Sequence, residues 1–127
     1  MKKVLRGQIY YAELDPVIGS EQGGLRPVVI LQCNKGTKNC PTCIIAPLTK
    51  LVNKKFKMKS HVLIRPKNYL THYSVVLVEH TRAISKDRLK QLISKVTSNE
   101  QRYINKAIVN TFGLEEEESG INEKEDL

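Results

Sequence analysis

The segment Ser74-Val75-Val76-Leu77-Val78-Glu79-His80 decides the fold class, because it is the most apolar stretch of the chain and ends in polar residues. Valine and leucine fill its centre, which is typical of a buried strand. The segment Pro27-Val28-Val29-Ile30-Leu31-Gln32-Cys33 has the same character, and its proline stands at the first position, where a strand tolerates one. Two buried strands of this kind predict a fold with a β-sheet at its centre.

Three more segments are predicted strands, and the segments between them are predicted connections. The strands are residues 8–14, 42–48 and 61–65, and residues 81–84 extend or follow the strand at 74–80. Pro47 lies inside one of them and indicates an edge strand or a bulge. The connections are a glycine-rich stretch at 17–25, a turn at 34–39 and an exposed basic loop at 51–60.

Two helices are predicted after the last strand. Ser85 can cap a short helix, whose apolar residues at helical spacing are Leu89, Leu92, Ile93 and Val96. A longer helix is expected to begin at Ser98, which forms a capping-box pattern with Gln101, and to end at Gly113. Its inner stripe is Ile104, Ala107, Ile108 and Thr111. The segments together predict a mainly β (α+β) fold, a small barrel of five or more strands with one short and one C-terminal helix.

The charge of the chain is divided between a basic body and an acidic end. The whole chain of 127 residues carries a formal charge of +8. Residues 115–127 contain seven acidic side chains and one Lys, a charge of −6, which leaves 20 positive and 6 negative side chains on residues 1–114, a charge of +14. We therefore expect one domain at 1–114, followed by a flexible acidic tail. The basic body makes RNA or DNA the first partner class to consider, with a merely solvated basic surface as the alternative.

Membrane and export signals are not found in the sequence. The longest apolar runs, 28–31 and 75–78, are far shorter than the about 20 residues of a membrane-spanning helix. Arg6 and Gln8 interrupt the N-terminal segment before the apolar core of a signal peptide could form. We therefore expect a cytoplasmic protein with no membrane partner.

The three cysteines, Cys33, Cys40 and Cys43, are an odd number in a chain without an export signal, which argues against a disulfide framework. Cys40 and Cys43 have the CxxC spacing of zinc sites and redox pairs, but a fourth ligand is missing. Three interpretations stay open: a metal site, a redox-responsive pair, and small apolar side chains at strand ends. We expect no metal in the functional site.

The segment from Gly19 to Pro27 has the composition of a phosphate-binding loop. Its glycines allow the backbone to approach a phosphate closely, and Ser20 and Gln22 add hydrogen-bond donors. Arg26, fixed at the start of a strand by Pro27, offers a planar fork that suits phosphate oxygens. The alternative is a surface turn that an arginine–carboxylate pair closes.

Further polar residues follow directly where apolar strands end: Thr49, Glu79, His80 and Arg82. Several strand ends can converge at the mouth of a small barrel, so we assign Glu79 and His80 to RNA binding. Each has an alternative. Thr49 can simply end a strand, Glu79 can pair with Arg82, and His80 can be a structural histidine.

Blocks of the sequence resemble one known family. Residues 6–28, RGQIYYAELDPVIGSEQGGLRPV, are very similar to the opening of MazF/PemK-type toxins, the toxin half of type II toxin–antitoxin pairs. Residues 45–49, IAPLT, and 78–84, VEHTRAI, resemble the second and third blocks of the family, and residues 85–89 resemble its following helix. The resemblance covers residues 6–114.

This resemblance implies a homodimeric endoribonuclease with an SH3-like barrel and no cofactor. Such an enzyme cuts single-stranded RNA at short sequences, without a metal, to 2′,3′-cyclic phosphate and 5′-OH ends. The family's catalytic arginine and threonine match Arg26 and Thr49, and Ser20, Glu21 and Gln22 match the loop that shapes the RNA site. Glu21 and His80 are alternative candidates for the proton steps. A cognate antitoxin with an acidic C-terminal segment is the implied protein partner.

Three features depart from the family pattern. His80 stands where relatives usually carry Gln, which bears on the cleaved RNA sequence, and the Cys40–Cys43 pair and the acidic tail are additions. Two other functions are compatible with a basic barrel: a non-catalytic toxin of the same fold that inhibits gyrase, and a simple RNA-binding module. The similarity of residues 6–28 is to the ribonuclease branch, which favours the nuclease.

Overall fold

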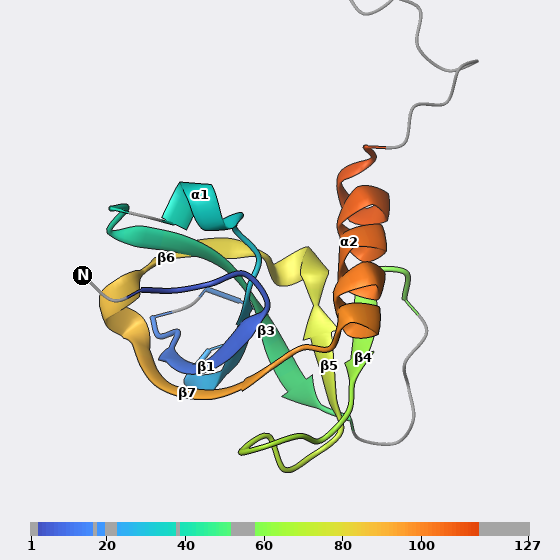
Figure 1. The fold of residues 1–127 in the computed structure, drawn as a ribbon, viewed down its shortest axis with the longest axis horizontal. Helices are drawn as coiled ribbons and strands as arrows, with labels where there is room; N and C mark the ends of the chain where they lie inside the picture. Colours follow the sequence, from blue (N-terminus) through green and yellow to red (C-terminus); the bar gives the residue numbers. More distant parts are fainter. Residues whose placement is uncertain (1–2, 17, 20–22, 38, 52–57, 115–127) are drawn as a thin grey trace, which may run out of the picture.

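The computed structural model describes residues 3–16, 18–19, 23–37, 39–51 and 58–114, and Figure 1 shows its ribbon. These residues form a mainly β structure with one long C-terminal helix. Its strands are β1 (Gln8–Glu13), β2 (Leu25–Ile30), β3 (Thr42–Lys50), β4 (His61–Ile64), β5 (Ser74–Leu77), β6 (Arg82–Ser85) and β7 (Leu89–Lys95). Its α-helices are α1 (Asn34–Thr37) and α2 (Ser98–Phe112). The 3-10 turns are η1 (Val78–His80) and η2 (Lys86–Arg88). The mainly β fold predicted from the sequence is confirmed.

The strands form one antiparallel sheet that curls into a small barrel (Figure 1). Its order is β4-β5-β3-β2-β1-β7, and β6 pairs with the first half of β3. The long strand β3 therefore joins two halves, because its residues 42–45 pair with β6 and its residues 48–50 pair with β5. This arrangement makes β3 the central strand on which both halves of the structure are built.

Pro47 had suggested that β3 is an edge strand or bulged, and the central position of β3 shows that the edge assignment is wrong. Ile45 is the last residue that pairs with β6, and Leu48 is the first that pairs with β5. Pro47 lies between them, where β3 has no partner on that side, and faces Val28 of β2 on the other. A proline is tolerated here because the ladder is already interrupted.

The buried apolar side chains form two clusters, one on each face of the sheet. Successive residues of one strand alternate between the two clusters. Val29 of β2 belongs to one cluster, whereas Val28 and Ile30 belong to the other, as the alternation of a strand requires. Helix α2 covers the first cluster with Ile104 and Ala107, both buried. Two residues of the predicted inner stripe, Ile104 and Ala107, are thus confirmed as buried, and a third, Ile108, is partly buried.

The predicted short helix over residues 85–96 is wrong. Ser85 accepts a hydrogen bond from the Asp87 N–H, but the capped element is only the turn η2, and the chain continues as strand β7. The pairing of β7 with β1 shifts register on both sides of Tyr10. Such bulges break the alternation of a strand, so the buried apolar residues of this segment fall at the spacing of a helical face. They are Leu89, Ile93 and Val96.

Helix α2 begins at Ser98, as predicted, but its capping box is formed by Thr97 and Glu100 and not by Ser98 and Gln101. Thr97 is the N-cap and accepts from the Glu100 N–H at 3.1 Å, while the Glu100 carboxylate accepts from the Thr97 N–H at 2.9 Å. Gly113 ends the helix in the left-handed region with φ of 66°, as predicted.

The segment predicted as a turn at 34–39 contains the single helical turn α1. Neither helix is long and apolar enough to cross a membrane, among the residues that the structure describes.

Candidate active site

Arg26 and Thr49 lie at adjacent ends of β2 and β3. The ladder between the two strands ends at Val28 opposite Pro47, and beyond it Arg26 Nη1 lies 3.5 Å from the carbonyl oxygen of Leu48, the residue before Thr49. Because side chains alternate along a strand, both residues share the face that carries Val28. Thr49 also pairs with Val75 of β5. The fold therefore brings together the two residues that the family resemblance had marked as catalytic.

Backbone carbonyl groups hold the half-buried Arg26 side chain in place. Its Nε donates to the Gly23 carbonyl oxygen at 3.0 Å, and its Nη1 donates to the Leu48 carbonyl oxygen at 3.5 Å. The second bond brings the guanidinium beside the residue that precedes Thr49. Arg26 Nη2 makes no hydrogen bond with any described residue. A guanidinium that is fixed on one edge and open on another suits bidentate binding of phosphate oxygens.

Hydrogen bonds close the base of the connection between β1 and β2. The Leu14 N–H donates to the Gly24 carbonyl oxygen at 3.0 Å, and the Gly24 N–H donates to the Asp15 carboxylate at 3.0 Å. Gly24 has a φ of 76°, in the left-handed region that favours glycine. The predicted RNA-contacting residues Ser20, Glu21 and Gln22 belong to this connection and lie outside the described residues.

Two further arginines donate hydrogen bonds to backbone carbonyl groups where the connection between β1 and β2 begins. Arg82 donates from Nη1 to the Leu14 carbonyl oxygen at 3.3 Å, and Arg88 donates from Nη1 to the Glu13 carbonyl oxygen at 3.1 Å and to the Asp15 carbonyl oxygen. Arg88 was not among the predicted site residues, because it fell in the predicted short helix. No local signal marks it, since Leu89 is followed by the polar residues Lys90 and Gln91.

Glu79 and His80 lie in the turn η1. The Glu79 carboxylate is 2.8 Å from His61 Nε2, so its partner is His61 and the alternative pairing with Arg82 is wrong. Partial burial raises the pKa of Glu79, but hydrogen bonds from His61 and from its own backbone N–H outweigh burial and lower the pKa overall. Among the described residues, no hydrogen bond or ion pair joins Glu79 or His80 to Arg26 or Thr49. The structure therefore shows Glu79 in a pair with His61.

The three cysteines have different surroundings. Cys43 is fully buried in the second apolar cluster, Cys40 is partly buried and Cys33 is exposed. Burial raises the pKa of the Cys43 thiol, whereas hydrogen bonds with Thr42 lower the pKa of Cys40. In the part of the chain that the structure describes, no three His, Cys, Asp or Glu side chains gather as metal ligands. Cys43 thus behaves as a small apolar core residue, which was one of the open interpretations.

Known proteins resemble the chain over most of its length. A family model described as PemK-like, MazF-like toxin of type II toxin–antitoxin system matches residues 5–112. Endoribonuclease MazF from Staphylococcus saprophyticus is 44% identical over 110 residues, which are 86% of this chain and 91% of that protein. A mycobacterial endoribonuclease in complex with its cognate antitoxin is 25% identical, with a TM-score of 0.72 over 89% of this chain and 98% of its own. MazF from Deinococcus radiodurans shares the fold, with a TM-score of 0.74 at 18% identity over 89% of this chain and 99% of its own.

Matches of this length and identity establish the class of protein, which is an endoribonuclease toxin of a type II toxin–antitoxin system. Within that class, the chain belongs to the family of PemK-like, MazF-like toxins. The family predicted from residues 6–28, 45–49 and 78–84 is therefore confirmed, and so is the predicted enzymatic activity.

Proposed function

We propose that this toxin cleaves single-stranded RNA at a short specific sequence, without a metal ion, and that Arg26 and Thr49 perform the catalysis. The observation that carries the proposal is the hydrogen bond from Arg26 Nη1 to the Leu48 carbonyl oxygen, which brings the guanidinium next to the residue that precedes Thr49. A charged fork and a hydroxyl donor side by side can bind two oxygens of one phosphodiester. The +14 charge of residues 1–114 supports RNA as the polyanion that this site attracts.

The substrate supplies its own nucleophile. The ribose 2′-OH attacks the adjacent phosphorus, its oxygen forms a bond to phosphorus, and the bond to the 5′ oxygen breaks. One proton leaves the 2′ oxygen and one proton reaches the departing 5′ oxygen, so the products are a 2′,3′-cyclic phosphate and a 5′-OH. The enzyme has to align the attack and stabilise the extra negative charge on the phosphoryl oxygens.

Arg26 fits the role of stabilising charge better than that of moving protons. A guanidinium keeps its protons at neutral pH and is therefore a poor base, whereas its fixed donors are well suited to a phosphoryl oxygen. Thr49 adds a hydroxyl that can donate to a second oxygen. Glu21 and His80 remain the candidates for the proton steps, and Ser20, Gln22 and Glu79 remain candidates for RNA contacts.

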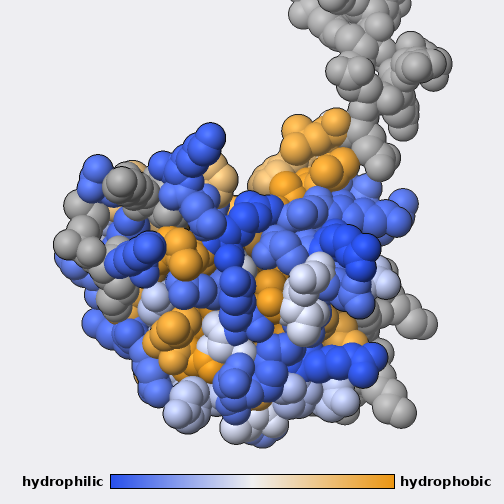
Figure 2. All heavy atoms as spheres, in the orientation of Figure 1, coloured by the Kyte–Doolittle hydropathy of each residue, from blue (hydrophilic) through white to orange (hydrophobic). Residues whose placement is uncertain are grey.

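The proposed partners are a second copy of the chain and a cognate antitoxin in the cytoplasm. Figure 2 shows an apolar patch at the C-terminal end of α2, where Phe112 and Leu114 are 55% and 61% exposed. Exposed apolar side chains of this size support burial in a homodimer. An acidic C-terminal segment of the antitoxin is attracted by the basic body of the toxin, and the antitoxin complex of the mycobacterial relative supports such a partner.

The test is cleavage of single-stranded RNA by the purified protein, with and without EDTA. Arg26→Ala and Thr49→Val should each lower kcat by about 100-fold or more, whereas Arg102→Ala, an exposed arginine on α2, should leave kcat unchanged. Mapping the 5′ ends of the fragments gives the cleaved sequence, and chemical analysis of the ends identifies the cyclic phosphate. Loss of all activity in EDTA, or wild-type kcat in Arg26→Ala, contradicts the proposal, and binding without cleavage would leave only an RNA-binding module.

A further inference from the structure

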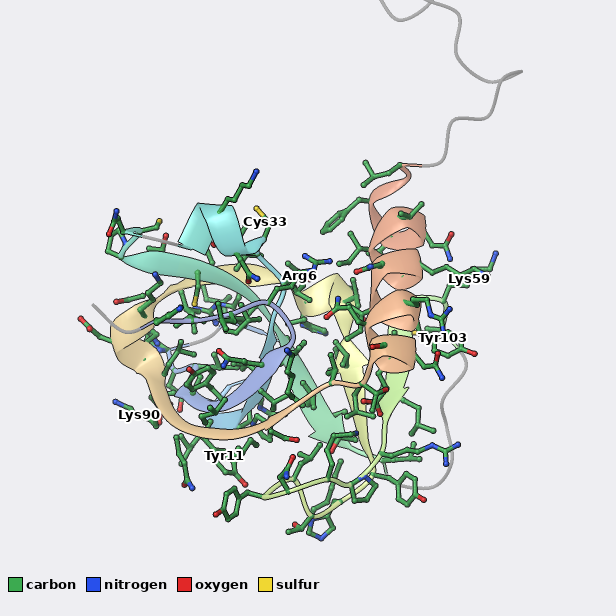
Figure 3. All side chains as sticks on the ribbon, viewed as in Figure 1. Arg6, Tyr11, Cys33, Lys59, Lys90 and Tyr103 are labelled. Carbon is green, nitrogen blue, oxygen red and sulfur yellow. The ribbon has the colours of Figure 1, made fainter. Side chains whose placement is uncertain are left out.

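A groove runs between strand β4 and helix α2, apart from Arg26 and Thr49. Its volume is about 1150 Å³, which is large enough for several nucleotides or a short peptide. Figure 3 places Lys59 and Tyr103 on the same side of α2, where they border this groove. Its polar lining includes Lys59, Arg65, Lys67, Tyr103, Lys106 and Asn110.

The groove carries more positive charge than its own acid can neutralise. Its only lining acid among the described residues is Glu100, which is 7% exposed. The Glu100 carboxylate already accepts from Lys67 Nζ and from the Arg65 backbone N–H, each at 2.9 Å. The side chains of Lys59, Arg65 and Lys106 make no ion pair with any described residue. Three cations that have no acidic partner in the described part of the chain predict an anionic ligand.

The remaining lining residues indicate which anionic ligand fits. Tyr103 is 65% exposed, although an aromatic ring has much to gain from burial. Lys106 follows Tyr103 by three residues on α2, so the ring and a cation lie on the same helical face. Asn110 extends this face by one more turn with an amide that both donates and accepts. An exposed ring next to a cation is how proteins stack a base and neutralise its phosphate.

The groove begins close to the candidate active site. Val75 of β5 pairs with Thr49 on one side and with Leu63 of β4 on the other, and Leu63 lines the groove. Adjacent strands lie about 4.8 Å apart, so the Cα atoms of Thr49 and Leu63 are separated by about 10 Å. Stacked nucleotides repeat every 3.4 Å or so along one strand. About three nucleotides therefore cover the distance from Thr49 to the groove.

We propose that the groove between β4 and α2 is a second binding site for single-stranded RNA, which holds nucleotides that flank the cleaved bond. The proposal rests on the endoribonuclease function and extends it to a longer substrate. In this site the Tyr103 ring stacks on a base, and Lys59, Arg65 and Lys106 contact phosphates. An acidic peptide would use the same cations, but it would leave the exposed ring and the Asn110 amide without a role. RNA uses all of these groups, so the structure favours RNA.

The test measures binding of RNA to the full chain with 2′-O-methylated oligonucleotides. Their blocked 2′ oxygen cannot attack, so binding is measured separately from cleavage and from the role of Arg26. A short RNA of about four nucleotides and a long RNA of about sixteen, both containing the cleaved sequence, bracket the site sizes of single-strand binders. Tyr103→Ala should weaken binding of the long RNA about tenfold and that of the short RNA much less. Tyr103→Phe keeps the ring and should bind like the wild type.

The charge of the groove is tested through the salt dependence of binding. Lys106→Ala should reduce the slope of log affinity against log salt by about 1 for the long RNA, because one phosphate contact is lost. Lys90→Ala removes an exposed lysine on β7, which Figure 3 shows on the far side of the molecule, and should leave affinity and slope unchanged. Thermal unfolding of each variant checks that the fold is retained.

Two results overturn the proposal. If Tyr103→Ala and Lys106→Ala bind the long RNA as tightly as Lys90→Ala does, the groove does not hold RNA. If a synthetic peptide with the sequence of residues 115–127 binds the wild type and loses affinity in Lys106→Ala, while RNA binding is unchanged, the groove is an acidic-peptide site. A loss of cleavage with intact binding of the methylated RNA concerns Arg26 and Thr49 instead, and leaves the second site in place.

Discussion

Glu100 joins the start of α2 to the end of β4, and we predict that Glu100→Gln destabilises the fold strongly. One carboxylate oxygen accepts from the Thr97 N–H, and the other accepts from the Arg65 N–H and from Lys67 Nζ, all at 2.9 Å. Glutamine can keep the bond to Thr97, because a capping box accepts either residue. Its amide nitrogen then faces the Arg65 N–H and the Lys67 ammonium, which are both donors.

The size of the effect follows from the two bonds that are lost. A partly buried backbone N–H left without an acceptor costs about 1–2 kcal/mol, and a bond from an ammonium to a carboxylate contributes about 1–2 kcal/mol at a partly exposed lysine. The expected loss is therefore about 2–4 kcal/mol in the free energy of unfolding. For a domain of this size, each kcal/mol lowers Tm by about 3–5 °C. Urea unfolding followed by circular dichroism measures the free energy directly.

The pH dependence gives a second and sharper test. Burial raises the pKa of Glu100, but hydrogen bonds from the backbone N–H groups of Thr97 and Arg65 outweigh it and lower the pKa below its ordinary value. A carboxyl with a lowered pKa stabilises the fold above its unfolded pKa of about 4.3, and this contribution is lost as pH falls below that value. The difference in stability between wild type and Glu100→Gln should thus be largest at neutral pH and should shrink in acid.

A matched control is available on the surface. Asp87→Asn changes an exposed carboxylate in η2 and should alter the free energy of unfolding by less than about 0.5 kcal/mol at any pH. The reasoning is refuted if Glu100→Gln is as stable as Asp87→Asn at pH 7. It is equally refuted if the deficit of Glu100→Gln is the same at pH 3 as at pH 7, because the carboxylate charge would then contribute nothing.

Three other predictions concern activity. Arg26→Lys keeps the charge but loses the fixed fork, so kcat for RNA should fall about 100-fold, and a kcat near wild type would contradict the role of the guanidinium. Replacing Cys33 and Cys40 with Ser and Cys43 with Ala should leave cleavage within a few-fold of wild type, whereas loss of stoichiometric zinc together with stability would reveal a metal site. Deleting residues 115–127 should leave KM unchanged; a lower KM at low salt that disappears at high salt would show that the acidic tail competes with RNA.

The strands could be predicted wherever local pattern and tertiary structure agree. The apolar runs that form β2 and β5 are rich in β-branched residues. Such runs predict strands that are buried on both faces. In β7 the pattern was misleading, because bulges opposite Tyr10 moved Leu89, Ile93 and Val96 to helical spacing. A bulge depends on the partner strand, and no local pattern in β7 encodes it.

The start of α2 shows the same limit on a finer scale. Thr97 and Ser98 are both good N-cap residues, and each is followed three residues later by a residue that completes a capping box. The local sequence therefore permits two starts. The Glu100 carboxylate decides between them, because it also bonds to the Arg65 N–H and to Lys67, which are more than thirty residues away. A tertiary contact thus sets a boundary that local propensity leaves open.

The candidate site could be located by resemblance but not by pattern. Nothing local relates position 26 to position 49, and only the pairing of β2 with β3 brings these two parts of the chain together. The groove could not be predicted from the sequence at all, because Lys59, Arg65 and Lys106 come from different segments of the chain. Their convergence depends on how α2 packs on β4, which sequence periodicity does not specify.

The position of Thr49 links catalysis to the packing of the whole sheet. Three arginines donate to carbonyl groups around the base of the β1–β2 connection, but Arg82 and Arg88 donate to the end of β1, whereas Arg26 donates to Leu48 of β3. Of these three arginines, Arg26 is the one that donates to the residue directly before Thr49. Because Thr49 is also paired with Val75, any shift of β5 against β3 moves this hydroxyl relative to the guanidinium. The apolar run that decided the fold class thus also fixes the distance between the two groups proposed to bind the phosphate.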